Sequence, residues 1–342
     1  MKKPPVIPRH LLGAPPYLHA LRQRERWGKG EILFWLALVA VFFLFPKNLL
    51  LASQILIAGL FALSLDLILG YAGIVTLGHA AFFGLGAYTA GLITRVGVHD
   101  PFLGLVAAAA VAAAAGWLTS FLVLRANDLG RLMITLGIAM LLYEVANRAT
   151  AITGGVDGMQ GVEIGLVLGL FRFDLLGRTA YLYVLGVTFV LFLLVRALMV
   201  SPYGLSLRCI RENNRRAQAI GVPIRARLTN IYTFSALLAG VAGALLTQTT
   251  QFVGIEVLGF QRSADLLIML IVGGTATLYG GFVGAAVFML AQDRLANLSP
   301  EYWLFWLGLL LIVVTLYLDG GVVGGLKRVA AWVQRRRTEA RQ

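Results

Sequence analysis

A series of long apolar stretches recurs along this chain and limits its fold more than any other feature. A helix needs about 20 mostly apolar residues to cross a bilayer, and most of the stretches approach or exceed that length. Of all residues, 59% are hydrophobic and 13% are charged, whereas soluble globular domains carry about 25% charged residues. The sequence therefore excludes a soluble enzyme and predicts an all-α integral membrane protein. The stretches lie near residues 30–46, 50–69, 74–94, 102–124, 131–150, 180–199, 226–250, 262–273, 281–297 and 303–319.

The basic residues indicate how the chain crosses the membrane. Of its 29 Lys and Arg residues, seven lie in residues 1–29, six in 201–227 and six in 320–342. Cytoplasmic segments of membrane proteins are enriched in Lys and Arg, so we expect both termini and the 201–227 loop in the cytoplasm. About ten transmembrane helices satisfy this requirement. We therefore predict a basic arm (1–29), a membrane domain (30–319) and a basic tail (320–342).

Glycine clusters occur within two of the apolar regions. Among the 39 glycines, five lie between Gly70 and Gly86 and five between Gly273 and Gly284. Non-helical backbone at membrane depth is tolerated where it is buried in protein or lines a cavity, and broken helices often mark transport sites. We therefore expect Gly-rich broken or re-entrant segments in both regions. Close packing of ordinary helices is the alternative, as the spacing of Gly280 and Gly284 illustrates.

Polar side chains within the apolar stretches are candidates for a substrate path. Ionisable groups in a membrane usually face the bundle interior or water, and Asp66, Glu144 and Asp265 are such groups. Helix–helix pairing is the alternative for each, and Glu144 has a local partner in Arg148 four residues later. His79 is suited to hydrogen-bond either a substrate or a neighbouring helix. The predicted path comprises Asp66, Thr76, Gly78, His79, Tyr88 and Glu144.

Motifs for catalysis, nucleotide binding and metal binding are missing from the sequence. No HExxH, GxSxG or GxxxxGK[ST] pattern occurs, so we expect no catalytic residue, no metal site and no cofactor on this chain. If ATP drives its work, another chain must bind the nucleotide. Nucleic acid is not an expected partner either, because the basic residues are not interleaved with aromatic residues on a folded polar face.

The 201–227 loop is too polar to span the membrane, yet its pattern is typical of short surface helices. Arg208 and Glu212 are spaced i,i+4, as are Glu212 and Arg216, which favours helical structure. Either asparagine after Glu212 is suited to cap a second helix, and Gly221 predicts the end of that helix. Such helices must lie on the membrane surface or dock in the groove of a partner. The charged positions favour a partner.

Four stretches of the sequence resemble one protein family. They read GYAGIVTLGHAAFFGLGAY (70–88), TGGVDGMQGVEI (153–164), GLSLRCIRENNRRAQAIGV (204–222) and GGTATLYGGFVGA (273–285). Together with the number of apolar stretches, they resemble the permease subunits of branched-chain amino acid ABC importers, the LivM-type more than the LivH-type. The last stretch departs from the family pattern, which usually has Gly where Ala276 stands and Pro where Gly281 stands.

The resemblance implies an ABC importer permease architecture and a set of partners. The partners are a second permease subunit in a heterodimer, two cytoplasmic ATPases that hold ATP and Mg²⁺, and a periplasmic or lipid-anchored solute-binding protein. The resemblance also implies that the 204–222 segment couples to an ATPase, and we expect the 153–164 loop to act as an outer gate. The coupling residues are expected to be Arg208, Arg211, Glu212, Asn213, Ala217, Ala219 and Gly221. The gate residues are expected to be Thr153, Gly154, Gly155 and Gly158.

These observations predict a permease that moves branched-chain or related small amino acids inward by alternating access, with separate ATPases as the motor. A urea or short-amide permease of the same family is one alternative. A stand-alone secondary transporter is another, and it would need its intramembrane acids to form a proton or sodium relay. Asp66, Glu144 and Asp265 lie on distant stretches, which argues against such a relay.

Overall fold

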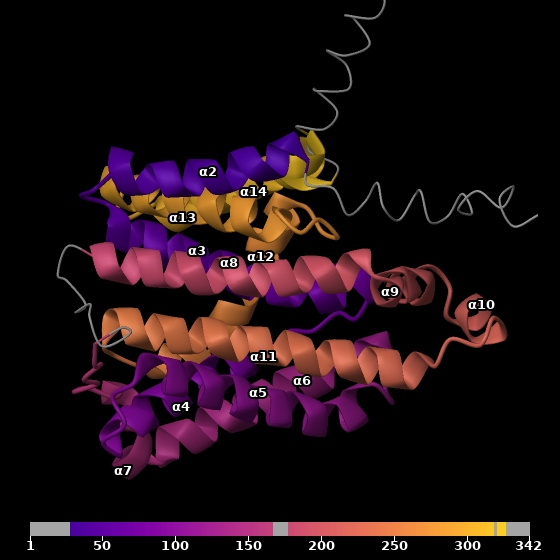
Figure 1. Ribbon diagram of the computed structural model, residues 1–342, viewed down its shortest axis with the longest axis horizontal. Helices are drawn as coiled ribbons and strands as arrows, with labels where there is room; N and C mark the ends of the chain where they lie inside the picture. The colour runs from indigo at the N-terminus through magenta and orange to yellow at the C-terminus, as the bar shows by residue number, and fades with distance from the viewer. Residues whose placement is uncertain (1–27, 167–176, 318–319, 326–342) are drawn as a thin grey trace, which may run out of the picture.

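The computed structural model describes residues 28–166, 177–317 and 320–325, and within these ranges its secondary structure is helical apart from one isolated β-bridge. Most of the long helices run side by side along the long axis of the molecule (Figure 1). In chain order the elements are α2 (Lys29–Leu44), α3 (Leu49–Asp66), the π-helix η2 (Leu67–Tyr71), α4 (Ala80–Arg95), α5 (Pro101–Val123), α6 (Asp128–Arg148), α7 (Thr150–Thr153), the 3-10 helix η3 (Gly155–Asp157), α8 (Arg178–Val200), α9 (Pro202–Glu212), α10 (Asn214–Ala219), α11 (Ile224–Thr250), the 3-10 helix η4 (Ile255–Leu258), α12 (Phe260–Gly273), α13 (Gly280–Leu298) and α14 (Trp303–Tyr317).

Five helical segments in the described ranges are long and apolar enough to cross a membrane. Shorter apolar helices occur at Gly30–Leu44 and Trp303–Val313. The expected all-α, multi-pass membrane protein is therefore confirmed, whereas ten crossings stay a prediction. The basic arm and tail lie almost wholly outside the described residues. The five segments are Leu49–Tyr71, Pro101–Val123, Asp128–Arg148, Arg178–Val200 and Ile224–Thr250.

Helices α3 and α11 form the centre of the body, and α6 lies at its periphery. Of the most apolar 18 residues in each segment, 72% are buried in both central segments and 17% in α6. Both central helices are rich in small residues, and the α11 glycine Gly240 lies opposite Gly86 of α4. Small residues let helix backbones approach closely. Because α6 is apolar and exposed, its surface is suited to face lipid.

Helical structure stops within both glycine clusters. The third apolar stretch was expected to be helical from about residue 74, but α4 begins only at Ala80 and residues 72–79 form a non-helical connection. Gly73 has a φ of +74° there, which glycine adopts without the steric penalty of a Cβ atom. A second non-helical connection, residues 274–279, separates α12 from α13. That either connection re-enters the membrane stays a prediction.

Candidate functional site

The α9–α10 segment (Pro202–Ala219) projects at one end of the helical body, on the right in Figure 1. Local polar contacts explain its two short helices. The Ser201 hydroxyl accepts a hydrogen bond from the N–H of Tyr203 at 3.2 Å and caps α9. Asn213 is extended, with a φ of −160°, and its Oδ1 accepts a hydrogen bond from the N–H of Arg216 at 3.0 Å to cap α10. Gly221 has a φ of +83° just after the second helix.

The structure confirms the two short helices that were expected in this segment. An asparagine after Glu212 does cap the second helix, and Gly221 does follow its end. Glu212 and Arg216 do not pair, because the extended Asn213 separates the two helices and breaks the i,i+4 register. Glu212 takes part in none of the ion pairs found within the described residues. Its charge is exposed to solvent.

The α9–α10 segment is amphipathic and buries its apolar side against the body. Leu207, Ile210 and Ala217 are buried, whereas Glu212, Arg215 and Arg216 are exposed. Ile220, just beyond α10, is 72% exposed. The outer surface therefore combines charges with a bare apolar side chain, a composition suited to bind a protein partner.

Two arginines of α9 connect the segment to the end of α3. Arg211 donates a hydrogen bond from Nη1 to the carbonyl oxygen of Gly70. The guanidinium of Arg208 lies over the ring of Tyr71, 5.2 Å from its centroid, in a cation–π arrangement. Both contacts fall on the π-helix η2, an element that often marks functional positions in helices.

The same end of α3 also contacts the loop between α12 and α13. Asp66 is fully buried, and its Oδ1 accepts a hydrogen bond from the N–H of Ala276 at 2.7 Å. Arg208, Arg211, Glu212 and Ala276 line a cavity of about 490 Å³. Three of the four family-like stretches therefore meet at the base of α9.

The polar residues predicted for the substrate path are mostly involved in helix packing. Thr76 and Tyr88 are buried, and His79 is 1% exposed. The Nε2 of His79 lies 2.8 Å from the Ser64 hydroxyl, and the Ser235 hydroxyl donates to the carbonyl oxygen of Ser64 at 2.5 Å. These contacts join α3 and α11 at the start of α4, so His79 has the neighbouring-helix role that was considered as its alternative.

Two further path residues lie on α6 or against it. Glu144 is half exposed on α6 and pairs with Arg148 at 2.6 Å. This local pair is the alternative that its i,i+4 spacing offered. A Cβ atom at Gly78 would overlap the backbone of Thr135, so this glycine permits a close approach of the 72–79 connection to α6. Close packing therefore accounts for Gly78, and the structure leaves the roles of both residues in transport as predictions.

The predicted gate loop lies at the end of the body opposite the α9–α10 segment (Figure 1). Its glycines Gly154, Gly155 and Gly158 all have positive φ, at 79°, 59° and 72°. The Thr153 hydroxyl donates to the carbonyl oxygen of Ala146 at 2.5 Å. The isolated bridge between Met159 and Val253 then joins this loop to the residues after α11.

A cavity of about 480 Å³ with both charged and apolar walls lies between α3, α4, α11, η4, α12 and α13. Sequence reasoning singled out Asp265 but assigned it no part in the path, and it missed the other lining residues. Their signal in the sequence is the polar run Gln261, Arg262 and Asp265 at the start of an apolar helix. The cavity is lined by Gln54, Ile57, Ala58, Phe61, Phe83, Leu246, Glu256, Gln261, Arg262, Asp265, Leu266, Met269, Phe288, Met289 and Gln292.

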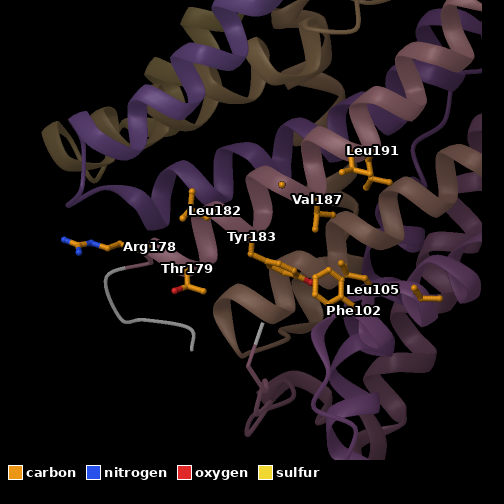
Figure 2. Close-up of a pocket in the computed structure, with 11 residues that line it drawn as sticks. Phe102, Leu105, Arg178, Thr179, Leu182, Tyr183, Val187 and Leu191 are labelled. Atoms are coloured by element: carbon orange, nitrogen blue, oxygen red, sulfur yellow. The ribbon is translucent and has the colours of Figure 1, made fainter. Parts of the chain in front are cut away.

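A larger groove of about 750 Å³ separates α5 from α8 (Figure 2). Its wall consists mainly of apolar side chains such as Leu105, Val187 and Leu191, with Arg178 and Thr179 near the start of α8. The Tyr183 hydroxyl, on the same face, donates to Oε1 of Gln248 at 2.8 Å. A surface of this composition is suited to lipid chains rather than to a polar solute.

Membrane-length helices, a charged segment at one end and a cavity of mixed polarity are features expected of a multi-pass membrane permease. The chain belongs to the family described as the branched-chain amino acid transport system permease component, which it matches over residues 48–315. It is a membrane permease subunit of an ABC importer.

Three curated proteins illustrate the similarity. The high-affinity branched-chain amino acid transport system permease protein LivM of Salmonella typhimurium is 26% identical over 318 residues, which cover 85% of this chain and 74% of that protein. LivM of Escherichia coli is 26% identical over 295 residues, 80% of this chain and 69% of that protein. The probable LivH of Methanocaldococcus jannaschii is 27% identical over 223 residues, 61% of this chain and 67% of that protein. No solved structure matches the chain significantly.

Proposed function

We propose that this chain carries branched-chain or related small amino acids across a bacterial cytoplasmic membrane by alternating access, and that it makes and breaks no covalent bond in doing so. Two partner ATPases bind ATP and Mg²⁺ and supply the driving force. The relatives named for branched-chain amino acid transport support this cargo. The missing phosphate-binding motif in the sequence supports a nucleotide site on other chains.

The contacts of the α9–α10 segment support this coupling most directly. Its outward side carries unpaired Glu212 and exposed arginines, while Arg211 binds the carbonyl oxygen of Gly70 on the inward side. Movement of the segment by an ATPase would therefore act on the end of α3, and through Asp66 on the loop that carries Ala276. A single docked segment would thus act on the end of α3, before the 72–79 connection, and on the 274–279 connection.

The remaining partners follow from the two ends of the molecule. The gate loop (153–164), at the end opposite α9, is proposed to receive the cargo from a periplasmic or lipid-anchored solute-binding protein. A second permease subunit is proposed to complete the transport path. The basic arm (1–29) and tail (320–342) are proposed to lie on the cytoplasmic side together with α9, as the distribution of Lys and Arg favours.

Charge reversal on the α9–α10 segment tests this proposal in the complete transporter. Glu212→Arg is expected to lower amino acid uptake by about tenfold or more, because a charge pair at a protein interface is replaced by repulsion. Glu301→Arg is the matched control, since Glu301 is an exposed acid between α13 and α14 and belongs to none of the ion pairs found within the described residues. Both variants should reach the membrane in the amount of the wild type.

Three outcomes separate the proposal from its alternatives. Uptake lost in Glu212→Arg and kept in Glu301→Arg supports docking of an ATPase. Equal uptake by the two variants contradicts docking at α9–α10. Accumulation of solute on an ion gradient, by vesicles that hold this chain alone, would instead support a stand-alone secondary transporter.

A further inference from the structure

We infer that the cavity between α3, α11 and α12 is a binding site for a zwitterionic amino acid with an aliphatic side chain. In this site Arg262 binds the carboxylate of the cargo, and Asp265 and Glu256 bind its ammonium group. The inference rests on the proposed transport function and adds the place and the chemistry of recognition within this chain.

Charges of both signs line one cavity. Arg262, Asp265 and Glu256 all line it, and none of them belongs to an ion pair within the described residues. Gln261 donates a hydrogen bond to Oδ1 of Asp265 at 2.9 Å, which orients the carboxylate and leaves its second oxygen free of this bond. A zwitterion would satisfy a guanidinium and a carboxylate at the same time.

Apolar and aromatic side chains make up another part of the cavity wall. Phe61 and Phe83 are buried, with ring centroids 4.4 Å apart. Ile57 of α3, Leu246 of α11 and Met269 of α12 extend the same wall. An aliphatic side chain placed against this wall would remove apolar surface from water, at about 25 cal/mol per Å² buried.

The dimensions and polarity of the cavity favour an amino acid over urea or a lipid. Its volume of about 480 Å³ lies within the roughly 300–1,000 Å³ of small-molecule sites. Urea carries neither charge nor hydrocarbon, so it would leave the charged groups and the apolar wall unused. The groove between α5 and α8 is larger but mainly apolar, so it lacks the groups that would recognise a zwitterion.

The position of the cavity is consistent with cargo entry from the gate-loop side. Gln54 lines it near the start of α3, about 18 Å along the helix from Asp66, which lies near α9. Glu256 belongs to η4, which begins two residues after Val253, the residue bridged to Met159 of the gate loop. The gate loop and the cavity wall are therefore joined through four residues of backbone.

Binding of radiolabelled leucine to the purified complete transporter, without the solute-binding protein, tests the site directly. We expect Arg262→Gln and Asp265→Asn each to weaken leucine binding by about tenfold or more, because each removes a charged hydrogen bond. The matched controls are Arg294→Gln and Asp293→Asn, exposed charges on α13 that do not line the cavity. Thermal unfolding and ATPase activity report whether each variant is folded and assembled.

Competition by leucine analogues adds a test of charge. In the wild type, isopentylamine and 4-methylpentanoate, which lack the carboxylate or the amine, should compete about tenfold or more weakly than leucine. Arg262→Gln should lose much of its preference for leucine over isopentylamine. If the cavity variants bind leucine as the controls do while the wild type transports it, the site is wrong and the proposed function stands. If the wild-type transporter carries no amino acid, the proposed function itself fails.

Discussion

The carboxylate of Asp66 accepts a hydrogen bond from the backbone N–H of Ala276, 2.7 Å away, although the two residues are 210 positions apart. Asp66 ends α3 and is fully buried. Four residues later, the carbonyl oxygen of Gly70 accepts a hydrogen bond from Arg211. Asp66 therefore links the base of the α9–α10 segment to the loop between α12 and α13.

Removal of the Asp66 carboxylate should destabilise the protein. Asp66→Ala leaves the N–H of Ala276 without its partner, which costs about 1–3 kcal/mol for a buried group. Asp66→Asn should cost less, because an amide oxygen still accepts the hydrogen bond. Thermal unfolding in detergent measures the difference. Ser120→Ala serves as the control, since the Ser120 hydroxyl bonds only within its own helix, and a larger loss there would contradict the assigned role of Asp66.

Ala276 adopts a backbone conformation that favours glycine. Its φ of +59° lies in the left-handed region, which costs an L-residue roughly 1–2 kcal/mol per position. Ala276→Gly should therefore raise the stability of the protein by up to about 1 kcal/mol, after the entropy that glycine loses on folding. Ala264→Gly, within helix α12, should lower it by about 1 kcal/mol. Thermal unfolding shifts of the same sign in both variants would contradict this account.

The contact between Ser64 and His79 should act as a coupled pair. Ser64→Ala removes the hydroxyl that lies 2.8 Å from the imidazole Nε2, and His79→Ala removes the imidazole. A double-mutant cycle in thermal or denaturant unfolding should give a coupling energy of about 0.5–1.5 kcal/mol. If His79 lined the path of the cargo instead, its variant would change the KM of uptake while the coupling energy stayed near zero.

The long helices were predicted reliably from the sequence, because the thickness of the bilayer sets the length of an apolar stretch. The stretch expected near 226–250 agrees closely with α11, at Ile224–Thr250. The break at residues 72–79 was harder to place, because Ile74 and Val75 continue the apolar pattern while only the backbone departs from it. Glu212 and Arg216 form no pair for a related reason, since i,i+4 spacing brings two side chains together only within one unbroken helix.

The internal cavity could not be assembled from the sequence. Its polar lining residues run from Gln54 to Gln292, and no spacing rule relates positions so far apart. His79 stood out as a polar group in an apolar stretch, but a buried side chain that bonds a neighbouring helix has the same signature as one that lines a path. Only the arrangement of the helices separates the two cases.

Helix α11 packs so closely on α4 that the contact leaves no room for an added methyl group at Gly243. A Cβ atom at Gly243 would overlap the backbone of Phe83 and lie 3.0 Å from the N of Ala87. Gly243→Ala should therefore destabilise the protein by about 1–3 kcal/mol, the usual cost of overpacking. Gly137→Ala is the matched control, because nothing lies within 4 Å of that position on α6, and alanine there should gain up to about 1 kcal/mol in helix propensity. Thermal unfolding in detergent should move in opposite directions for the two variants. An unchanged midpoint for Gly243→Ala would mean that α4 and α11 lie farther apart in the membrane than this packing requires.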